Sequence, residues 1–129
     1  MTALDTHTAI WLTQDQAQLS STARRALAEG RMAGGLAIAD ITLREIAMLV
    51  SRGRISVSTP LGIYLRFIES LFRVLPVTAE IAEQSVRFSP TYPNDPADRL
   101  IGATAVVHGM RLVTVDKKIR ASREVDCIW

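Results

Sequence analysis

Four acidic residues are expected at the edge of an open α/β sheet where active sites usually lie. Asp5 follows a short apolar run at the N-terminus, and Asp116 follows a second apolar run, RLVTV. Both runs are typical of strands, and the carboxyl ends of neighbouring parallel strands open onto one crevice. Glu45 and Asp98 each lie near the start of a predicted helix. We therefore expect these four carboxylates to meet at one edge of the sheet.

Crowded carboxylates repel one another unless cations neutralise them or their pKa values rise. Oxygen donors without paired His or Cys favour Mg²⁺, or Mn²⁺, over zinc. Such an ion activates water for in-line attack on a phosphodiester. The sequence therefore predicts metal-dependent phosphodiester hydrolysis, with Asp5, Glu45, Asp98 and Asp116 as catalytic residues and metal ligands.

Each acid also has a structural interpretation. The helix dipole alone favours Asp98 in a first turn, and Glu45 completes a capping box with Thr42. Asp116 fits an ordinary turn, whereas Asp5 is the hardest to explain without a ligand. Asp95 precedes a proline, so a turn or helix cap is favoured over metal binding, and we assign it a supporting role only.

Hydroxyl and basic side chains surround the predicted ligands. Thr114 and Thr6 are positioned to hold a ligand carboxylate, Thr114 being the better candidate because strand alternation places it on the side of Asp116. Without the four acids, fifteen Lys and Arg face nine Asp and Glu, a balance of +6 that suits a polyanion. The predicted phosphate contacts are the basic residues that flank the ligands: Arg44, Arg99, Lys117 and Lys118. The two histidines lack a partner at helical spacing, and we expect both to be structural.

The hydrophobic pattern alternates strands with helices, which predicts a parallel sheet covered on both faces. Gly30 is expected to end the second helical segment, and Gly109 the last long helix. The predicted strands are Thr2–Leu4, 35–39, 73–76, Arg111–Val115 and 125–128, and the predicted helical segments are a turn at 9–12 and helices at 19–29, 42–51, from Pro60 to about 71, 79–86 and 97–108.

Composition sets the remaining limits. The 129 residues are about one domain long, and no uncharged run approaches the roughly 20 residues of a membrane span. The N-terminal stretch lacks a basic leader, which predicts a cytoplasmic protein. One cysteine, Cys127, excludes an internal disulfide and a Cys-rich zinc site.

Four segments, LDTHTAIW, DITLREIAMLVSRGRI, DPADRLIGATA and LVTVD, together resemble the PIN-domain ribonuclease toxins of the VapC type. The resemblance implies a three-layer α/β/α PIN-like domain over residues 1–129, with a mainly parallel sheet of four to five strands. It places Asp5, Glu45, Asp98 and Asp116 on the family's acidic positions and Thr114 on its hydroxyl position.

The same resemblance implies a Mg²⁺-dependent endoribonuclease that cleaves structured RNA, usually transfer or ribosomal RNA. It also implies a homodimer and a cognate VapB-type antitoxin, which would lie in a groove near Trp11 and the helix at 61–72.

Other functions fit less well. A haloacid dehalogenase phosphatase needs a second aspartate two residues after the first, where this chain has His7. A receiver domain needs an acidic pair before the first strand-end aspartate, but only MTAL precedes Asp5. A nucleotide-binding fold needs a Gly-rich loop after a strand, and this sequence has none. The alternative from another class is a catalytically inactive PIN-like module that binds a partner protein.

Overall fold

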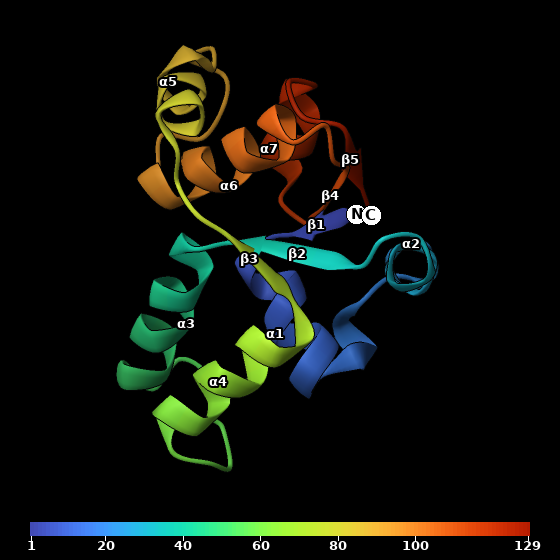
Figure 1. The fold of residues 1–129 in the computed structure, drawn as a ribbon, viewed down its shortest axis with the longest axis vertical. Coiled ribbons are helices and arrows are strands. Elements are labelled where there is room, and N and C mark those ends of the chain that lie inside the picture. The colour runs from blue at the N-terminus through green and yellow to red at the C-terminus, as the bar shows by residue number, and fades with distance from the viewer.

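The computed structural model describes residues 1–129 and shows three layers, with a central sheet between two sets of helices (Figure 1). All strand pairs are parallel, and the strand order is β3-β2-β1-β4-β5. In the centre, Leu4 of β1 is in register with Ile38 of β2 and Val113 of β4. The predicted parallel sheet with two covered faces is confirmed. The strands are β1 (Thr2–Leu4), β2 (Leu36–Ala39), β3 (Arg73–Leu75), β4 (Leu112–Val113) and β5 (Cys127–Ile128).

Seven α-helices and one short 3-10 helix, Gln16–Gln18, connect the strands. Helices α5, α6 and α7 lie on one side of the sheet in Figure 1, and α1, α3 and α4 lie on the other. The helices are α1 (Thr6–Gln14), α2 (Ser21–Met32), α3 (Ile41–Ser51), α4 (Leu61–Leu71), α5 (Ala79–Arg87), α6 (Pro96–Val107) and α7 (Lys117–Ser122). No helix is long and apolar enough to cross a bilayer.

Side-chain alternation along the strands divides the core into two clusters. Ala3, Ala37 and Ala39 face the side of α5, α6 and α7, whereas Leu4 and Ile38 face the opposite side. Because the first three are alanines, the α6 backbone can approach the sheet closely. Helix α6 is accordingly buried over five successive residues, Ile101–Ala105.

Two early helices are longer than predicted. The sequence suggested only a turn at 9–12, but α1 begins at Thr6 because the Asp5 carboxylate accepts a hydrogen bond from the Thr8 amide. Helix α2 does not end at Gly30 and continues to Met32. A Cβ at Gly30 would lie 2.8 Å from the Thr2 hydroxyl oxygen, so the glycine permits close packing on β1.

The C-terminal elements differ more. Strands β4 and β5 contain two residues each, shorter than the predicted 111–115 and 125–128. Helix α7 was not predicted: Asp116 caps it, and Arg123 ends it in a left-handed conformation with φ of 58°. Gly109, with φ of 64°, follows α6 as expected.

Candidate active site

A cleft of about 260 Å³ opens at the carboxyl ends of β1 and β4. The structure places all four predicted acids around it, although they come from four different segments of the chain. Asp95 and Thr6 also line it. The complete lining is Asp5, Thr6, His7, Glu45, Asp95, Asp98, Ile101, Val115 and Asp116.

Asp5 is held by hydrogen bonds to both carboxylate oxygens. Oδ1 accepts from the Thr8 amide at 2.9 Å, and Oδ2 accepts a short hydrogen bond from the Thr114 hydroxyl. The Thr114 oxygen in turn accepts from the Asp116 amide at 3.1 Å. One buried hydroxyl therefore connects Asp5 to the backbone of Asp116, as strand alternation suggested for Thr114.

Glu45 is oriented from another element. The Thr6 hydroxyl donates a short hydrogen bond to Glu45 Oε1, and Thr42 lies 3.2 Å from the same hydroxyl oxygen. Because the Thr6 hydrogen is used, Thr42 is the donor of that second bond. The capping-box interpretation is wrong: α3 begins at Ile41, and neither Thr42 nor Glu45 caps it.

Asp95 and Asp98 occupy the start of α6. Asp95 is at the N-cap position, but its carboxylate makes no capping hydrogen bond. The Asp98 side chain also has no hydrogen-bond partner, whereas its backbone carbonyl accepts from the Tyr92 hydroxyl at 2.8 Å. Both carboxylates are therefore free to bind a ligand in the cleft.

The cleft disfavours the ionised form of its own carboxyl groups. Burial raises the pKa of Asp5 and of Glu45. Burial, then the charges of Asp95, Glu45, Asp116 and Asp5, raises the pKa of Asp98 to about 7. The protein has two ion pairs, Arg87 with Glu83 and Arg111 with Asp126, and neither includes a cleft acid. Five acids thus share one cleft without a basic partner within ion-pair distance.

An oxygen-rich donor set of this kind fits Mg²⁺ or Mn²⁺ in charge and ligand type. No three of the acidic side chains already form a group that could hold a metal ion. Mg²⁺ commonly keeps several waters and needs only one or two carboxylates. Asp95 and Asp98 can turn toward such an ion without breaking a side-chain hydrogen bond.

His7 lines the cleft, which sequence reasoning missed. The lack of a histidine partner at helical spacing predicts a structural role, but this criterion applies only to metal sites built on one helix. The position of His7 two residues after a strand-end aspartate was the available signal, because the first turn of α1 starts at the cleft.

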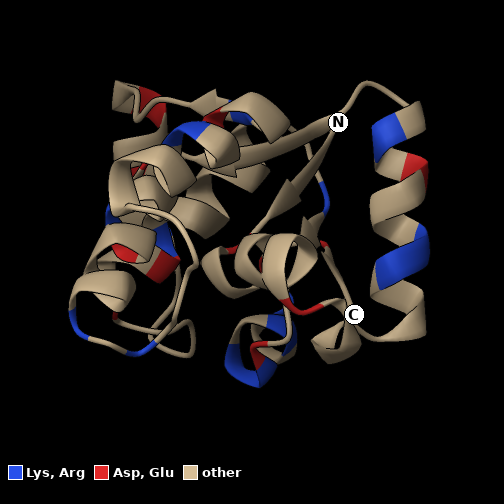
Figure 2. Ribbon diagram, turned by 90° about the horizontal axis from the view of Figure 1, so that it is seen from below, with Lys and Arg blue, Asp and Glu red and all other residues tan.

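Arg99, predicted as a phosphate contact, bonds to the protein's own backbone and does not line the cleft. Its guanidinium donates to the carbonyls of residues 85, 88, 89, 92 and 93 and to the Asn94 side chain, at 3.0–3.5 Å, and lies 5.8 Å from the centre of the Tyr92 ring. These bonds fasten the loop that leads into α6. Arg44, Lys117 and Lys118 are exposed and flank the cleft in sequence without lining it. Figure 2 shows Lys and Arg spread over several helices rather than gathered at one edge.

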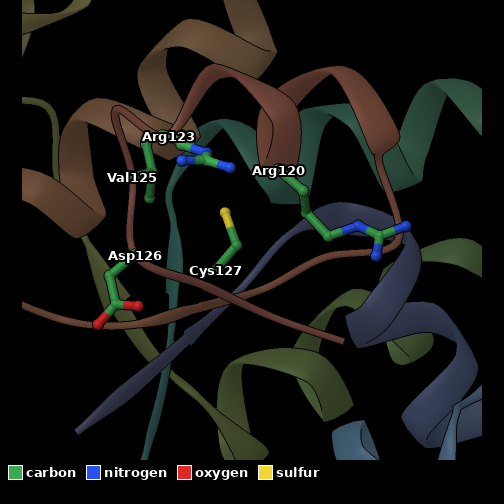
Figure 3. A pocket seen from close by; sticks show the side chains of 5 residues that line it. All are labelled: Arg120, Arg123, Val125, Asp126 and Cys127. Carbon is green, nitrogen blue, oxygen red and sulfur yellow. The ribbon is translucent and has the colours of Figure 1, made fainter.

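A larger hollow of about 440 Å³ lies beside β5 and shares no residue with the acidic cleft. Its lining is Arg120, Arg123, Val125, Asp126 and Cys127. The Cys127 sulfur points into it, and the Arg120 guanidinium is directed away (Figure 3). Burial raises the pKa of the Cys127 thiol to about 11, so the thiol is a poor nucleophile at neutral pH.

The chain resembles known proteins over nearly its whole length. Residues 2–124 match the PIN domain family. Ribonuclease VapC22 of Mycobacterium tuberculosis is 38% identical over 120 residues, which cover 93% of this chain and 90% of that protein.

Two solved structures share the fold. The toxin-antitoxin complex from Klebsiella pneumoniae has a TM-score of 0.72 at 24% identity, covering 100% of this chain and 97% of the other. VapBC2 from Rickettsia felis, bound to a promoter DNA fragment, has a TM-score of 0.74 at 16% identity, covering 98% and 96%. The family match over residues 2–124 and the 38% identity show that this chain belongs to the PIN-domain family, among its VapC-type members.

Proposed function

We propose that the protein is a Mg²⁺-dependent endoribonuclease, with Mn²⁺ as a possible substitute, and acts as the toxin of a VapBC-type toxin-antitoxin system. The observation that carries this proposal is the cleft itself, where five carboxylates face one another without a basic partner. Its relationship to a ribonuclease at 38% identity supports RNA as the substrate. We expect structured RNA, such as transfer or ribosomal RNA, to be cleaved.

The residues of the cleft have different proposed roles, as metal ligands or as residues that orient the ligands. Asp5, Asp98 and Asp116 are the proposed ligands, together with Glu45, and Asp95 assists from the rim. Thr114 and Thr6 keep two of these carboxylates turned toward the cleft through their hydrogen bonds. When bound, a divalent ion supplies positive charge for the attacking water and for the scissile phosphate.

Basic residues outside the cleft are the proposed contacts for the rest of the RNA. Arg44, Lys117 and Lys118 are exposed next to cleft residues in sequence. Lys117 and Lys118 begin α7, directly after Asp116. Phosphate contacts of this kind position the strand without reading its sequence.

Asp98→Asn is the most informative test, because the Asp98 side chain has no hydrogen-bond partner to lose. Purified protein is incubated with total RNA and Mg²⁺, and fragments are resolved on a denaturing gel. We expect discrete fragments from the wild type, none in EDTA, and restoration by Mg²⁺ or Mn²⁺. Cleavage by the variant should fall more than about 100-fold, since even residues behind metal ligands contribute about 10–100-fold.

The matched control is Asp15→Asn, the same chemical change at an exposed acid outside the cleft. It should cleave like the wild type. Equal cleavage by Asp98→Asn and the wild type would indicate a contaminating nuclease. A wild type without any cleavage would favour the alternative of an inactive module that binds a partner protein.

We further propose that the 129 residues act as one PIN-like unit in the cytoplasm, as a homodimer, with a VapB-type antitoxin as partner. The structural neighbours include VapBC-1 from Haemophilus influenzae, with a TM-score of 0.73. A hollow of about 350 Å³ between α1 and α4 is the proposed antitoxin contact, with Ile63 and Phe67 on its wall. These two side chains are 54% and 47% exposed.

A further inference from the structure

His7 differs chemically from every other residue of the cleft. The remaining lining consists of five acids, the Thr6 hydroxyl and two apolar side chains. Ionised carboxylates only accept hydrogen bonds, and the Thr6 hydrogen already goes to Glu45. An imidazole always carries at least one N–H donor, so His7 offers the one side-chain N–H in the cleft to an anionic ligand.

The orientation of His7 leaves that donor available. The residue is exposed, and its side chain has no hydrogen-bond partner in the protein. Its ring lies 5.7 Å from the Trp11 ring at 53°, and Trp11 lies 5.9 Å from Trp129 at 55°. The aromatic neighbours therefore support the ring, while its polar atoms remain unpaired.

A purely structural role explains His7 poorly. His7 is the second residue of α1 and lines the cleft at the start of that helix. The imidazole is exposed, whereas its neighbours Thr6 and Thr8 are buried. The imidazole lines the same cleft as the Asp5 and Glu45 carboxylates.

We propose that the His7 imidazole donates an N–H hydrogen bond to a phosphate oxygen of the RNA that enters the acidic cleft. The inference rests on the proposed ribonuclease function and adds a substrate contact to it. In a cleft whose other charges repel phosphate, this contact holds the backbone next to the carboxylates.

Three substitutions separate the donor from the ring. His7→Phe keeps an aromatic ring on Trp11 but removes the donor, His7→Gln keeps an N–H donor without the ring, and His7→Ala removes both. With a labelled RNA hairpin that the wild type cleaves, we expect kcat/KM to fall about 10-fold or more in the Phe and Ala variants, the size of one hydrogen bond to a charged group. The Gln variant should remain within about threefold of the wild type. Thermal melting of each variant checks that it is folded.

A binding measurement separates this proposal from the function it rests on. The same hairpin, fluorescently labelled, is titrated in Ca²⁺ with Asp98→Asn and with the double variant that adds His7→Phe. We expect the added substitution to weaken binding about 10-fold. Wild-type kcat/KM and binding in His7→Phe would overturn the role of His7 while leaving the ribonuclease intact. A wild type that binds but never cleaves would overturn the ribonuclease, and the binding comparison would still decide the role of His7.

Discussion

The crowding of carboxyl groups in the cleft has a clear effect on the pKa of Asp98. Its carboxyl is only half-buried, yet burial and four neighbouring carboxylates raise its pKa from 3.8 to about 7. A carboxyl whose pKa is higher in the folded state binds protons more tightly there. Its contribution to stability is therefore full at a pH below 3.8 and is lost as the pH rises through 7.

The metal-free protein should consequently become more stable when this charge is removed. At pH 8 in EDTA, we expect Asp98→Asn to raise the free energy of unfolding by on the order of 1 kcal/mol, reduced from the full shift because the group is partly solvated. The melting temperature should rise by about 4 °C. Thermal unfolding at pH 8 and at pH 5 provides the measurement, and the gain should shrink at the lower pH.

Asp15→Asn serves again as the control, because that acid is exposed and outside the cleft. It should not change the melting temperature at either pH. A gain from Asp98→Asn that is equal at pH 5 and pH 8 would contradict the electrostatic explanation.

Individual residues show where sequence reasoning ends. Asp5 and Asp116 were placed correctly because a strand end has a fixed direction in a parallel sheet. Local spacing gave Glu45 a capping role, whereas its actual partner is Thr6, 39 positions away in the chain. The acceptors of Arg99 are mostly backbone carbonyls of a loop whose path no pattern encodes. Contacts made by tertiary structure therefore account for the errors.

At the scale of an element, α6 shows how a helix positions the site. Gly102 lies beneath Tyr92, whose hydroxyl binds the Asp98 carbonyl. A Cβ on Gly102 would lie 2.1 Å from that hydroxyl oxygen and 3.3 Å from the Phe88 ring. The glycine thus allows the packing that fixes the start of α6.

Gly102→Ala should therefore destabilise the protein despite the better helix propensity of alanine. We expect the free energy of unfolding in urea to fall by about 1–3 kcal/mol, the usual cost of overpacking a core. Gly62→Ala in α4 is the matched control, because the nearest atom to its Cβ would be the Arg66 guanidinium at 3.6 Å. This change should stabilise the protein by about 0.5–1 kcal/mol. Equal effects of the two substitutions would contradict the role assigned to Tyr92.

Most helices and strands were predictable from the periodicity of apolar residues, because each element must place apolar side chains in one of the two core clusters. The failures concern short elements whose ends depend on capping. Helix α7 has six residues, too few for a periodic pattern, and begins because Asp116 accepts hydrogen bonds from two amides, at 2.8 and 3.0 Å. The length of α1 similarly depends on the Asp5 cap.

At the scale of the whole molecule, the two helical layers present different surfaces. The α4 layer exposes Ile63, Phe67 and Leu71 along one helix, whereas the other layer exposes Val86 on α5 and Val106 on α6. Three apolar side chains along one helix face are typical of a groove that receives a partner helix.

Phe67→Asp should prevent co-purification of the antitoxin when the two are co-expressed. A buried charge in an apolar interface costs several kcal/mol, so the complex should be lost from a pull-down on the tagged toxin. RNA cleavage by the isolated variant should be unchanged, since Phe67 does not line the acidic cleft. Val86→Asp, the same substitution on the opposite layer, should leave the complex intact. If instead it dissociated the complex and Phe67→Asp did not, the antitoxin would bind the α5 side.

The hydrogen bonds of Arg99 order the segment that precedes α6 during folding, before any ligand binds. The chain from 88 to 95 is a long connection without regular structure, but one guanidinium from α6 holds it at five acceptors and also donates to the Ser85 carbonyl at the end of α5. Its conformational entropy is therefore lost when the chain folds, and little remains to be lost on association. The backbone carrying Asp95 and Asp98 is preorganised, so a ligand has only their side chains left to arrange.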